Sequence, residues 1–314
     1  SFFNSIDSQN VMFDESLYVI QGAVKNEQEE YKLYCGLKKG EKKIFKKNKK
    51  IYKKLADHIG FFPVVMITPY DINLILEGSE TRRRFFDALI AQFDKNYLFE
   101  LLQYNKLLKQ RNAFLKTNTS SVDLLEVYDE QMIEKAQSIH ESRKKFIDEF
   151  IPIFNKFYQD ISSNKEGVDL DYQSALHENT MKELFIQNRA KDQLVGHTSS
   201  GIHRDDFLFS INSNPLKKFG SQGQQKTYLI ALKLAKFEYI KLKKNVNPVL
   251  LLDDIFDKLD DHRVGYILNL IEKNNLGQTF ITDTSKEKIP QILANLNIES
   301  NLFWIENGNS SKLN

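Results

Sequence analysis

The chain has 314 residues, which is long enough to bury one large core or two smaller ones, and 27% of them are charged. This composition excludes a disordered chain, and a net charge of only +2 does not by itself indicate a nucleic-acid binder. No stretch approaches the length of a membrane span, and no signal-peptide pattern opens the sequence. The single cysteine, Cys35, has no partner for an internal disulfide or a CxxC metal site, so a cytoplasmic protein is expected.

The first part of the chain has the patterns of β-structure. Residues 17–24 and 31–37 alternate and carry Tyr, Val and Ile, which predicts two strands. Gly40 lies between lysine-rich segments and predicts a hairpin turn. Residues 51–59 are expected to form a short helix. Residues 64–67 are a short apolar run that predicts another strand.

Ten lysines fall between Lys38 and Lys54. Such a run suits a surface that follows the phosphates of DNA. The alternative, slightly favoured, is that the lysines solvate a hairpin or blunt a sheet edge, in a chain that is rich in lysine throughout. The candidate DNA contacts in this run are Lys42, Lys43, Lys46 and Lys47.

From Ser79 the pattern changes to long helical periods with few glycines. Helices are expected over residues 79–115, 122–158 with a bend near Pro152, and 174–194, with a polar loop over residues 162–171. Because these helices lie between β-rich segments, they predict a separate helical lobe over residues 79–195. The arginines of its first helix are further candidate DNA contacts, and a solvated first turn is a nearly equal interpretation; they are Arg82, Arg83 and Arg84.

Residues 249–252 form an aliphatic run that ends abruptly in Asp253 and Asp254. A run this short predicts a strand buried on both faces, as in parallel sheets, whose ligands collect beyond the carboxyl ends of the strands. A carboxylate pair there is suited to holding Mg²⁺ and orienting a water. Taken alone, the strand is equally well explained by a solvated acidic turn.

Residues 219–227, FGSQGQQKT, place small residues and glycines before a helical pattern over residues 228–241. A turn of this kind, leading into a helix N-terminus, presents free N–H groups and the positive end of the helix dipole to a phosphate. The simpler alternative is an ordinary helix start with a serine cap.

Together these pieces resemble an ABC-type ATPase head with a signature turn, a Walker B strand and a D-loop, and more specifically the RecF family of bacterial DNA replication and repair ATPases. The resembling stretches are Ser221-Gln222-Gly223-Gln224, Leu250-Leu251-Leu252-Asp253-Asp254, Lys258-Leu259-Asp260, Gly201-Ile202-His203-Arg204-Asp205-Asp206, Thr68-Pro69-Tyr70-Asp71 and Arg82-Arg83-Arg84-Phe85-Phe86-Asp87. The resemblance runs through nearly the whole chain.

The resemblance implies a role for each motif. Asp253 would hold Mg²⁺, and Asp254 would stand where most ABC ATPases have a glutamate that positions the attacking water, so that the shorter side chain implies slow turnover. Asp260 belongs to the D-loop, and Thr282 occupies the place where many ABC ATPases have a switch histidine. The signature residues would meet the γ-phosphate of a nucleotide held by a second subunit; they are Ser221, Gln222, Gly223 and Gln224.

Two departures from the family pattern stand out. GHTSSG at residues 196–201 has the glycine spacing of a phosphate loop, but Ile202 and His203 follow it instead of Lys and Ser or Thr, so it is not a Walker A motif. No other Walker A pattern is present, and the sequence is therefore expected to be N-terminally truncated and unable to hydrolyse ATP alone. The cluster from His203 to Asp206 is expected to form a structural ion-pair network.

The fold implied is α/β: an ABC-type head with a P-loop NTPase-like sheet, made of residues 1–78 and 196–314, with the helical lobe inserted. The implied function is ATP-dependent DNA binding in replication and recombinational repair, with ATP and Mg²⁺ as cofactors and ATP-driven homodimerisation. The implied partners are single-stranded or gapped DNA, bound without sequence preference, and RecO- and RecR-like proteins. The alternative is a non-hydrolysing clamp or scaffold that kept the ABC architecture.

Overall fold

The computed structural model describes residues 6–25, 29–117, 122–163, 166–255, 259–273, 276–285, 287–294 and 298–313. The chain divides into two compact units, Ser1–Phe62 and Pro63–Asn314. Within the ranges just given, no helix is both long enough and apolar enough to cross a membrane.

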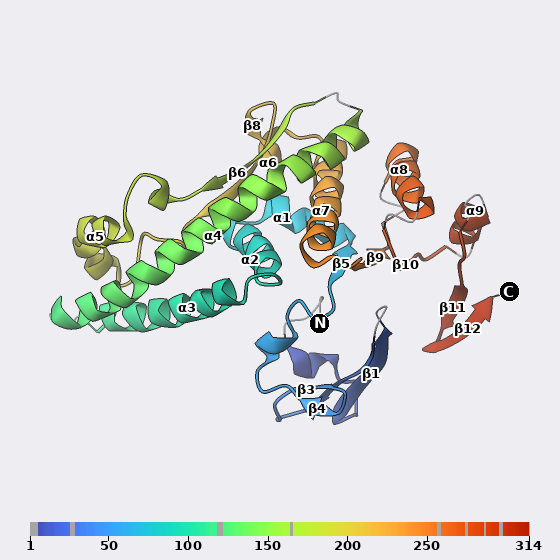
Figure 1. Cartoon of the computed structure of the whole chain (residues 1–314), viewed down its shortest axis with the longest axis horizontal. Helices are drawn as coiled ribbons and strands as arrows, with labels where there is room; N and C mark the ends of the chain where they lie inside the picture. Colours follow the sequence, from blue (N-terminus) through green and yellow to red (C-terminus); the bar gives the residue numbers. More distant parts are fainter. Residues whose placement is uncertain are drawn as a thin grey trace. The chain divides into compact units, whose positions relative to one another are not determined.

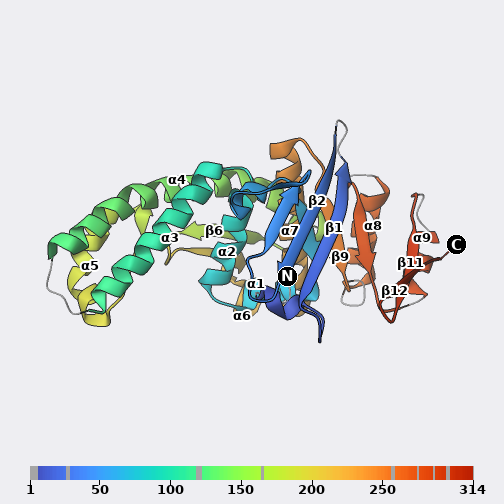
Figure 2. The same ribbon diagram turned by 90° about the horizontal axis from the view of Figure 1, so that it is seen from below.

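The first unit is built around one antiparallel sheet with the strand order β1-β2-β3-β4. Figure 2 shows β1 and β2 side by side. Its elements are β1 (Leu17–Lys25), β2 (Glu30–Lys38), β3 (Ile44–Lys47) and β4 (Lys50–Ile51), with 3₁₀ helices at Asp7–Asn10 and Leu55–His58. The two predicted strands are confirmed, and Gly40 has the positive φ of +82° that its turn requires. The helix predicted over residues 51–59 is confirmed only as the 3₁₀ helix Leu55–His58, because Asn48 and Lys49, both at positive φ, fold the chain back so that Lys50–Ile51 pair with β3.

The second unit contains a parallel sheet of three strands in the order β10-β9-β5. The strands are β5 (Val64–Ile67), β9 (Val249–Asp253) and β10 (Thr279–Thr282). The central strand, β9, has neighbours on both edges, and Leu250 and Leu252 are completely buried, as the aliphatic run predicted. The register pairs Leu252 with Ile67 and Asp253 with Thr282, so the three strands end together at one edge of the sheet.

A second set of elements forms the helical part of this unit. These are α1 (Asn73–Leu76) after a 3₁₀ turn at Pro69–Ile72, α2 (Ser79–Ile90), α3 (Lys95–Leu115), α4 (Val122–Ser162) and α5 (Met181–Val195) after a 3₁₀ turn at Ala175–His177. Figure 1 shows α3 and α4 running side by side, with α5 at their far end. Helix α4 also packs against α7 (Gln222–Lys244), where Tyr228 of α7 contacts Phe154 of α4 with ring centroids 4.7 Å apart.

The predicted helix boundaries need three corrections. The single helix expected over residues 79–115 is two helices, because Asp94 leaves the helical conformation and caps α3 by accepting a hydrogen bond from the Tyr97 N–H at 2.8 Å. The loop expected over residues 162–171 contains strand β6, which pairs with a strand distant in the sequence. The third helix begins at Met181 rather than at residue 174, because the capping box of Thr180 fixes its start.

The remaining elements complete the unit around the parallel sheet. They are β6 (Val168–Gln173), β7 (Asp206–Ile211) and β8 (Asn214–Pro215) in one antiparallel sheet, α6 (Leu216–Phe219), α8 (Asp261–Glu272), α9 (Lys288–Ala294), and the hairpin of β11 (Leu302–Glu306) and β12 (Asn309–Leu313). The alternation of β7 buries every second side chain, so this strand presents one apolar face to the core.

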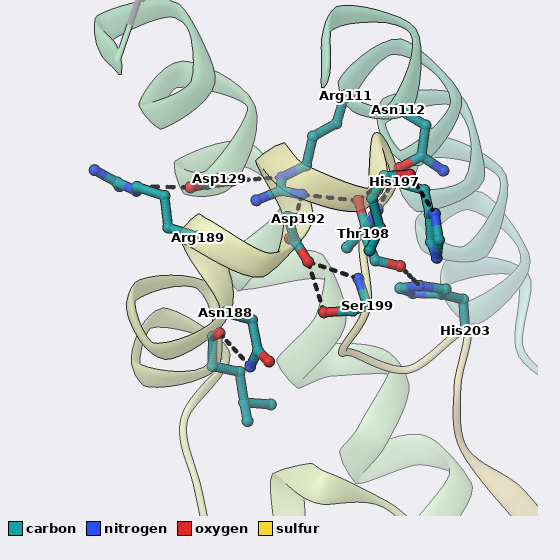
Figure 3. Close-up of polar contacts among 12 residues, drawn as sticks. Arg111, Asn112, Asp129, Asn188, Arg189, Asp192, His197, Thr198, Ser199 and His203 are labelled. Atoms are coloured by element: carbon teal, nitrogen blue, oxygen red, sulfur yellow. Dashed lines mark hydrogen bonds and ion pairs between the residues drawn. The ribbon is translucent and has the colours of Figure 1, made fainter. Parts of the chain in front are cut away.

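Two buried arginines hold the helical part together. Arg111 of α3 donates to Asp129 of α4 and to Asp192 of α5, each at 2.7 Å, and to the Thr198 hydroxyl at 2.9 Å (Figure 3). The side chain of Arg111 is completely buried, so the two carboxylates compensate a charge that has no access to water. This one guanidinium therefore joins three helices.

Arg143 of α4 makes the second such cluster. It donates to the Asp205 carboxylate and to the Ile202 carbonyl, both at 2.8 Å, and to both oxygens of Asp87 in α2 at 3.1 and 3.0 Å. The hydroxyl of Tyr172 also donates to Asp205, at 2.5 Å. The ion-pair network expected for the HRDD segment is therefore confirmed.

His203 of this segment is held as a neutral imidazole. Its Nε2 lies 3.1 Å from the Thr198 carbonyl, which can only accept, so Nε2 carries the proton and Nδ1 accepts from the Tyr104 hydroxyl at 2.9 Å. Burial lowers the pKa of His203 to about 4, and burial likewise lowers the pKa of His140 to about 4.

We predict that the protein loses stability as the pH falls from 6.5 to about 4, the window set by these two histidines. In this window the unfolded chain binds protons that the folded chain rejects, so each histidine contributes a slope of up to about 1.4 kcal/mol per pH unit. The measurement is the free energy of urea unfolding across this range. His203→Gln should flatten the profile, and an unchanged profile in that variant would remove His203 from this role.

Candidate functional site

The carboxyl ends of β9 and β10 bring together two residues that the sequence singled out separately. The Thr282 hydroxyl donates to Oδ1 of Asp253 at 2.7 Å, across the strand pair in which these two residues face each other. The Asp254 N–H donates to the Thr282 carbonyl at 3.2 Å, and Asp254 then turns away with a positive φ of +50°. The parallel ladder therefore fixes Asp253 and Thr282 against each other and places Asp254 at the point where the chain leaves the sheet.

A further acid lies beside this pair. Asp283 follows Thr282, and its Oδ1 accepts from the Ser285 N–H at 2.7 Å, while its Oδ2 is buried without a hydrogen-bond partner among the described residues. A buried carboxylate oxygen of this kind requires a cation or a donor. Within the described ranges, no group of three or more His, Cys, Asp or Glu residues could hold a metal by itself. Mg²⁺, which usually takes one or two carboxylates together with substrate phosphates and waters, fits this donor set.

The predicted signature turn forms the start of α7. Ser221 is the N-cap: its hydroxyl accepts from the Gln224 N–H at 3.2 Å, and the Gln224 side chain accepts from the Ser221 N–H at 2.7 Å. This reciprocal capping box explains why the helix starts here. Ser221 and Gln222 are exposed, whereas Gly223 and Gln224 are half-buried. The turn thus exposes its first two residues to solvent, and its next two residues are in contact with the rest of the protein.

Two residues that the sequence analysis missed fix it. The Gln224 side-chain amide donates to Glu166 at 2.8 Å, and Arg263 of α8 donates to the Gly223 carbonyl at 2.8 Å and to the Thr227 hydroxyl at 2.7 Å. The only feature of the sequence that could have indicated a role for Arg263 is its position three residues after Asp260. A residue at that spacing lies in the first turn of a helix that Asp260 caps.

The predicted D-loop lies partly outside the described residues, since Lys258 is not among them. Its Asp260 is described and caps α8 by accepting from the Arg263 N–H at 3.0 Å, and its carboxylate also forms an ion pair with the Arg263 side chain. Arg263 therefore contacts both the D-loop and the signature turn. No hydrogen bond or ion pair between described residues joins Asp253 or Asp254 to the signature turn.

The segment after β5 has a structural partner in α7. The carboxylate of Asp71 accepts a hydrogen bond from the Thr68 N–H at 2.9 Å, and it also forms an ion pair with the buried Lys233 at 2.6 Å. Lys233 donates in addition to the Met66 carbonyl at 2.9 Å. A partly open cavity of about 450 Å³ lies between this segment, the first turns of α7 and the residues after β9; Ile67, Gln222 and Ile255 are among its lining residues.

The three candidate DNA-contacting arginines differ in their surroundings. Arg82 forms a two-pronged ion pair with Asp206 at 2.8 and 2.9 Å, and Arg83 donates to the Asp205 carbonyl at 2.6 Å. Arg84 is 78% exposed and forms an ion pair with Glu80 on the same helix. Of the three side chains, only that of Arg84 points largely into solvent.

The candidate lysines of the first unit are likewise not equivalent. Lys42 is exposed, whereas Lys43 forms an ion pair with Asp7 at 2.6 Å. Lys46 lies over the Tyr34 ring at 4.7 Å, and Lys47 lies over the rings of Tyr31 and Phe61 at 4.1 and 3.8 Å. The ammonium groups of these two lysines lie over aromatic rings, so part of the charge run contributes to contacts within the first unit.

Comparison with known proteins gives a consistent result. No family model matches the chain. The DNA replication and repair protein RecF of Flavobacterium johnsoniae is 48% identical over 93% of this chain and 83% of its own length, and that of Phocaeicola vulgatus is 46% identical over 97% of this chain and 83% of its own.

Solved structures agree with these relatives. A structure of the recombination mediator protein RecF-ATP in the RecFOR pathway is 34% identical and covers all of this chain and 84% of its own, with a TM-score of 0.88; the corresponding structure of RecF-ATPrS is 31% identical with a TM-score of 0.86. An Smc head bound to the C-terminal winged-helix domain of ScpA, 13% identical with a TM-score of 0.51, shares the fold alone. The α/β fold is therefore that of an ABC-type ATPase head, and this chain belongs to the RecF family.

Proposed function

We propose that this chain binds DNA under the control of ATP and acts in DNA replication and recombinational repair. The observation that carries the proposal is the strand-end arrangement of Asp253, Thr282 and Asp254, found in a chain whose fold matches that of RecF-ATP along its whole length. Relatives named for DNA replication and repair support the process.

In this proposal, ATP lies between two copies of the protein, and the residues named here supply only part of the site, since the 314 residues contain no Walker A pattern. Bound ATP with Mg²⁺ supplies the phosphate that is cleaved, and the protein supplies positions and charges. Asp253 would hold the cation through the carboxylate to which Thr282 donates, and Asp254 would orient the attacking water. From the second copy, Ser221, Gly223 and Gln224 address the γ-phosphate.

The same proposal extends to the domains and the partners. Residues 1–78 and 196–314 form the head, and residues 79–195 form the inserted helical lobe. DNA is bound without sequence preference, through exposed lysines of the first unit such as Lys42 and through Arg84 of α2. The RecFOR context of the two solved RecF structures supports RecO- and RecR-like proteins as partners.

We predict that DNA binding depends steeply on salt and weakly on sequence. Replacing three exposed lysines of the first unit with glutamine, Lys42, Lys49 and Lys50, should weaken binding to gapped DNA. Each lysine that no longer neutralises a phosphate should make the plot of log affinity against log salt shallower by about 0.7 to 0.9. Fluorescence anisotropy at several salt concentrations measures this.

The matched control removes the same number of positive charges from another part of the protein. In it, three exposed lysines of α3 and α5 are replaced by glutamine: Lys106, Lys109 and Lys182. An equal loss of affinity in both triple variants would mean that overall charge, and not the first unit, determines the affinity. A strong preference for one base sequence would contradict the proposal itself.

A second prediction tests the shared nucleotide site in the full-length gene product. Ser221→Ala removes the cap of α7, and Thr180→Ala removes the matching capping box of α5, so each should lower stability by about 1 kcal/mol. Only Ser221→Ala should also lose ATPase activity, because only Ser221 addresses nucleotide. Equal activity in the two variants would exclude Ser221 from the site.

A complementation experiment then mixes two variants that are each expected to be inactive, Ser221→Ala and Asp254→Asn. A mixed dimer has one site in which both halves are intact, so an equimolar mixture should recover about one quarter of the parent activity if the dimer is symmetric and subunits exchange freely. No recovery, although dimers form, would mean that the signature turn and Asp254 do not act on the same nucleotide from two copies.

A further inference from the structure

The first turn of α7 is held by hydrogen bonds within a small polar cluster. Its members are Arg263 of α8, Glu166 between α4 and β6, Tyr158 of α4, and Gly223, Gln224 and Thr227 of α7. We refer to these six residues as the signature clamp. Its contacts come from three separate parts of the second unit.

Arg263 makes the most demanding contacts of the clamp. Its Nη2 donates to the Gly223 carbonyl at 2.8 Å and its Nε donates to the Thr227 hydroxyl at 2.7 Å, while the side chain also pairs with Asp260. The Thr227 hydroxyl donates its own hydrogen to the same Gly223 carbonyl at 3.0 Å. Two donors in the fixed plane of one guanidinium determine where the first turn of α7 lies, which a lysine could not do.

Glu166 connects the same turn to α4. One of its oxygens accepts from the Gln224 amide at 2.8 Å, and the other accepts from the Tyr158 hydroxyl at 2.7 Å. The ring of Tyr158 is completely buried and contacts that of Tyr228, so its hydroxyl has little freedom to move. A second link runs from the Tyr266 hydroxyl of α8 to Asp160 of α4 at 3.3 Å.

We propose that Arg263 and Glu166 are positioning residues for the half of the nucleotide site that this chain offers to a second copy. Arg263 holds the signature turn and the D-loop in a fixed relation, and Glu166 ties that pair to the end of α4. A shift at the end of α4 is then passed directly to the atoms that address the γ-phosphate. This inference rests on the proposed function, because it takes the nucleotide to be shared between two copies.

The test assigns Arg263 to one half of the site by mixing variants of the full-length gene product. Arg263→Leu alone should lower the ATPase rate on the order of ten- to a hundred-fold, since small misplacements of reacting groups have costs of this size. Its affinity for ATP as a monomer should not change, because the signature side acts only in the dimer. Arg263→Lys keeps the charge but not the two-pronged contact and should recover part of the rate.

Mixed with Asp254→Asn, Arg263→Leu should recover activity to the same extent as Ser221→Ala does. Mixed with Ser221→Ala, it should recover nothing, because both variants damage the same half. Recovery with Ser221→Ala would overturn the assignment, and so would full activity of Arg263→Leu. If Ser221→Ala and Asp254→Asn themselves fail to complement, the proposed function fails first, and the two failures are thereby distinguished.

Two milder variants guard against loss of folding. Thr227→Val replaces a buried hydroxyl with a methyl group of the same shape and should belong to the same complementation group as Arg263→Leu. Glu166→Gln keeps an acceptor for Gln224, whereas Glu166→Ala removes it, so only the alanine variant should show the full defect. Equal rates in these two Glu166 variants, or a parent-like rate in Glu166→Ala, would remove Glu166 from the clamp.

Discussion

The buried guanidinium of Arg143 is the interaction on which the second unit depends most. It binds Asp87 of α2 and Asp205 of the HRDD segment, and it does so from the middle of α4. Its side chain is almost completely buried, so leaving either carboxylate unpaired would cost roughly 3–5 kcal/mol. Because Asp206, next to Asp205, begins β7 and pairs with Arg82, this one cluster connects the helices to the antiparallel sheet.

The helix that carries Arg143 also connects the helical part of the second unit to the candidate site. Helix α4 carries Arg143 in its middle and Tyr158 near its end, so the same helix that is fixed by the buried ion pairs also contacts the signature turn through Glu166. The helix packs most extensively against α3 and α7. The candidate site is therefore connected to α4 through Glu166 in the segment that follows this helix.

The sequence allowed the parallel strands and the motif positions to be predicted because both are local. The aliphatic run before Asp253 identifies a central strand, and the fold of the RecF family follows from the order of the motifs. Strand β6 was missed because its alternation of Asp169 and Asp171 with apolar residues resembles a polar loop until β7, far along the chain, pairs with it. The role of Arg82 was equally hidden, since its partner Asp206 lies 124 residues away. The contacts of Arg263 form because the first turns of α7 and α8 lie close together in the folded protein. A local sequence pattern does not predict such a contact.

The backbone at Asp254 has a consequence for which acid can stand there. Its φ of +50° lies in the left-handed region, which Asn and Asp enter several times more readily than most other residues with a side chain. A glutamate at this position would bring a longer reach but would meet a backbone that disfavours it. The conformation thus favours Asp or Asn over glutamate at this position, and a glutamate there would be better accommodated if the chain left β9 with a different backbone conformation.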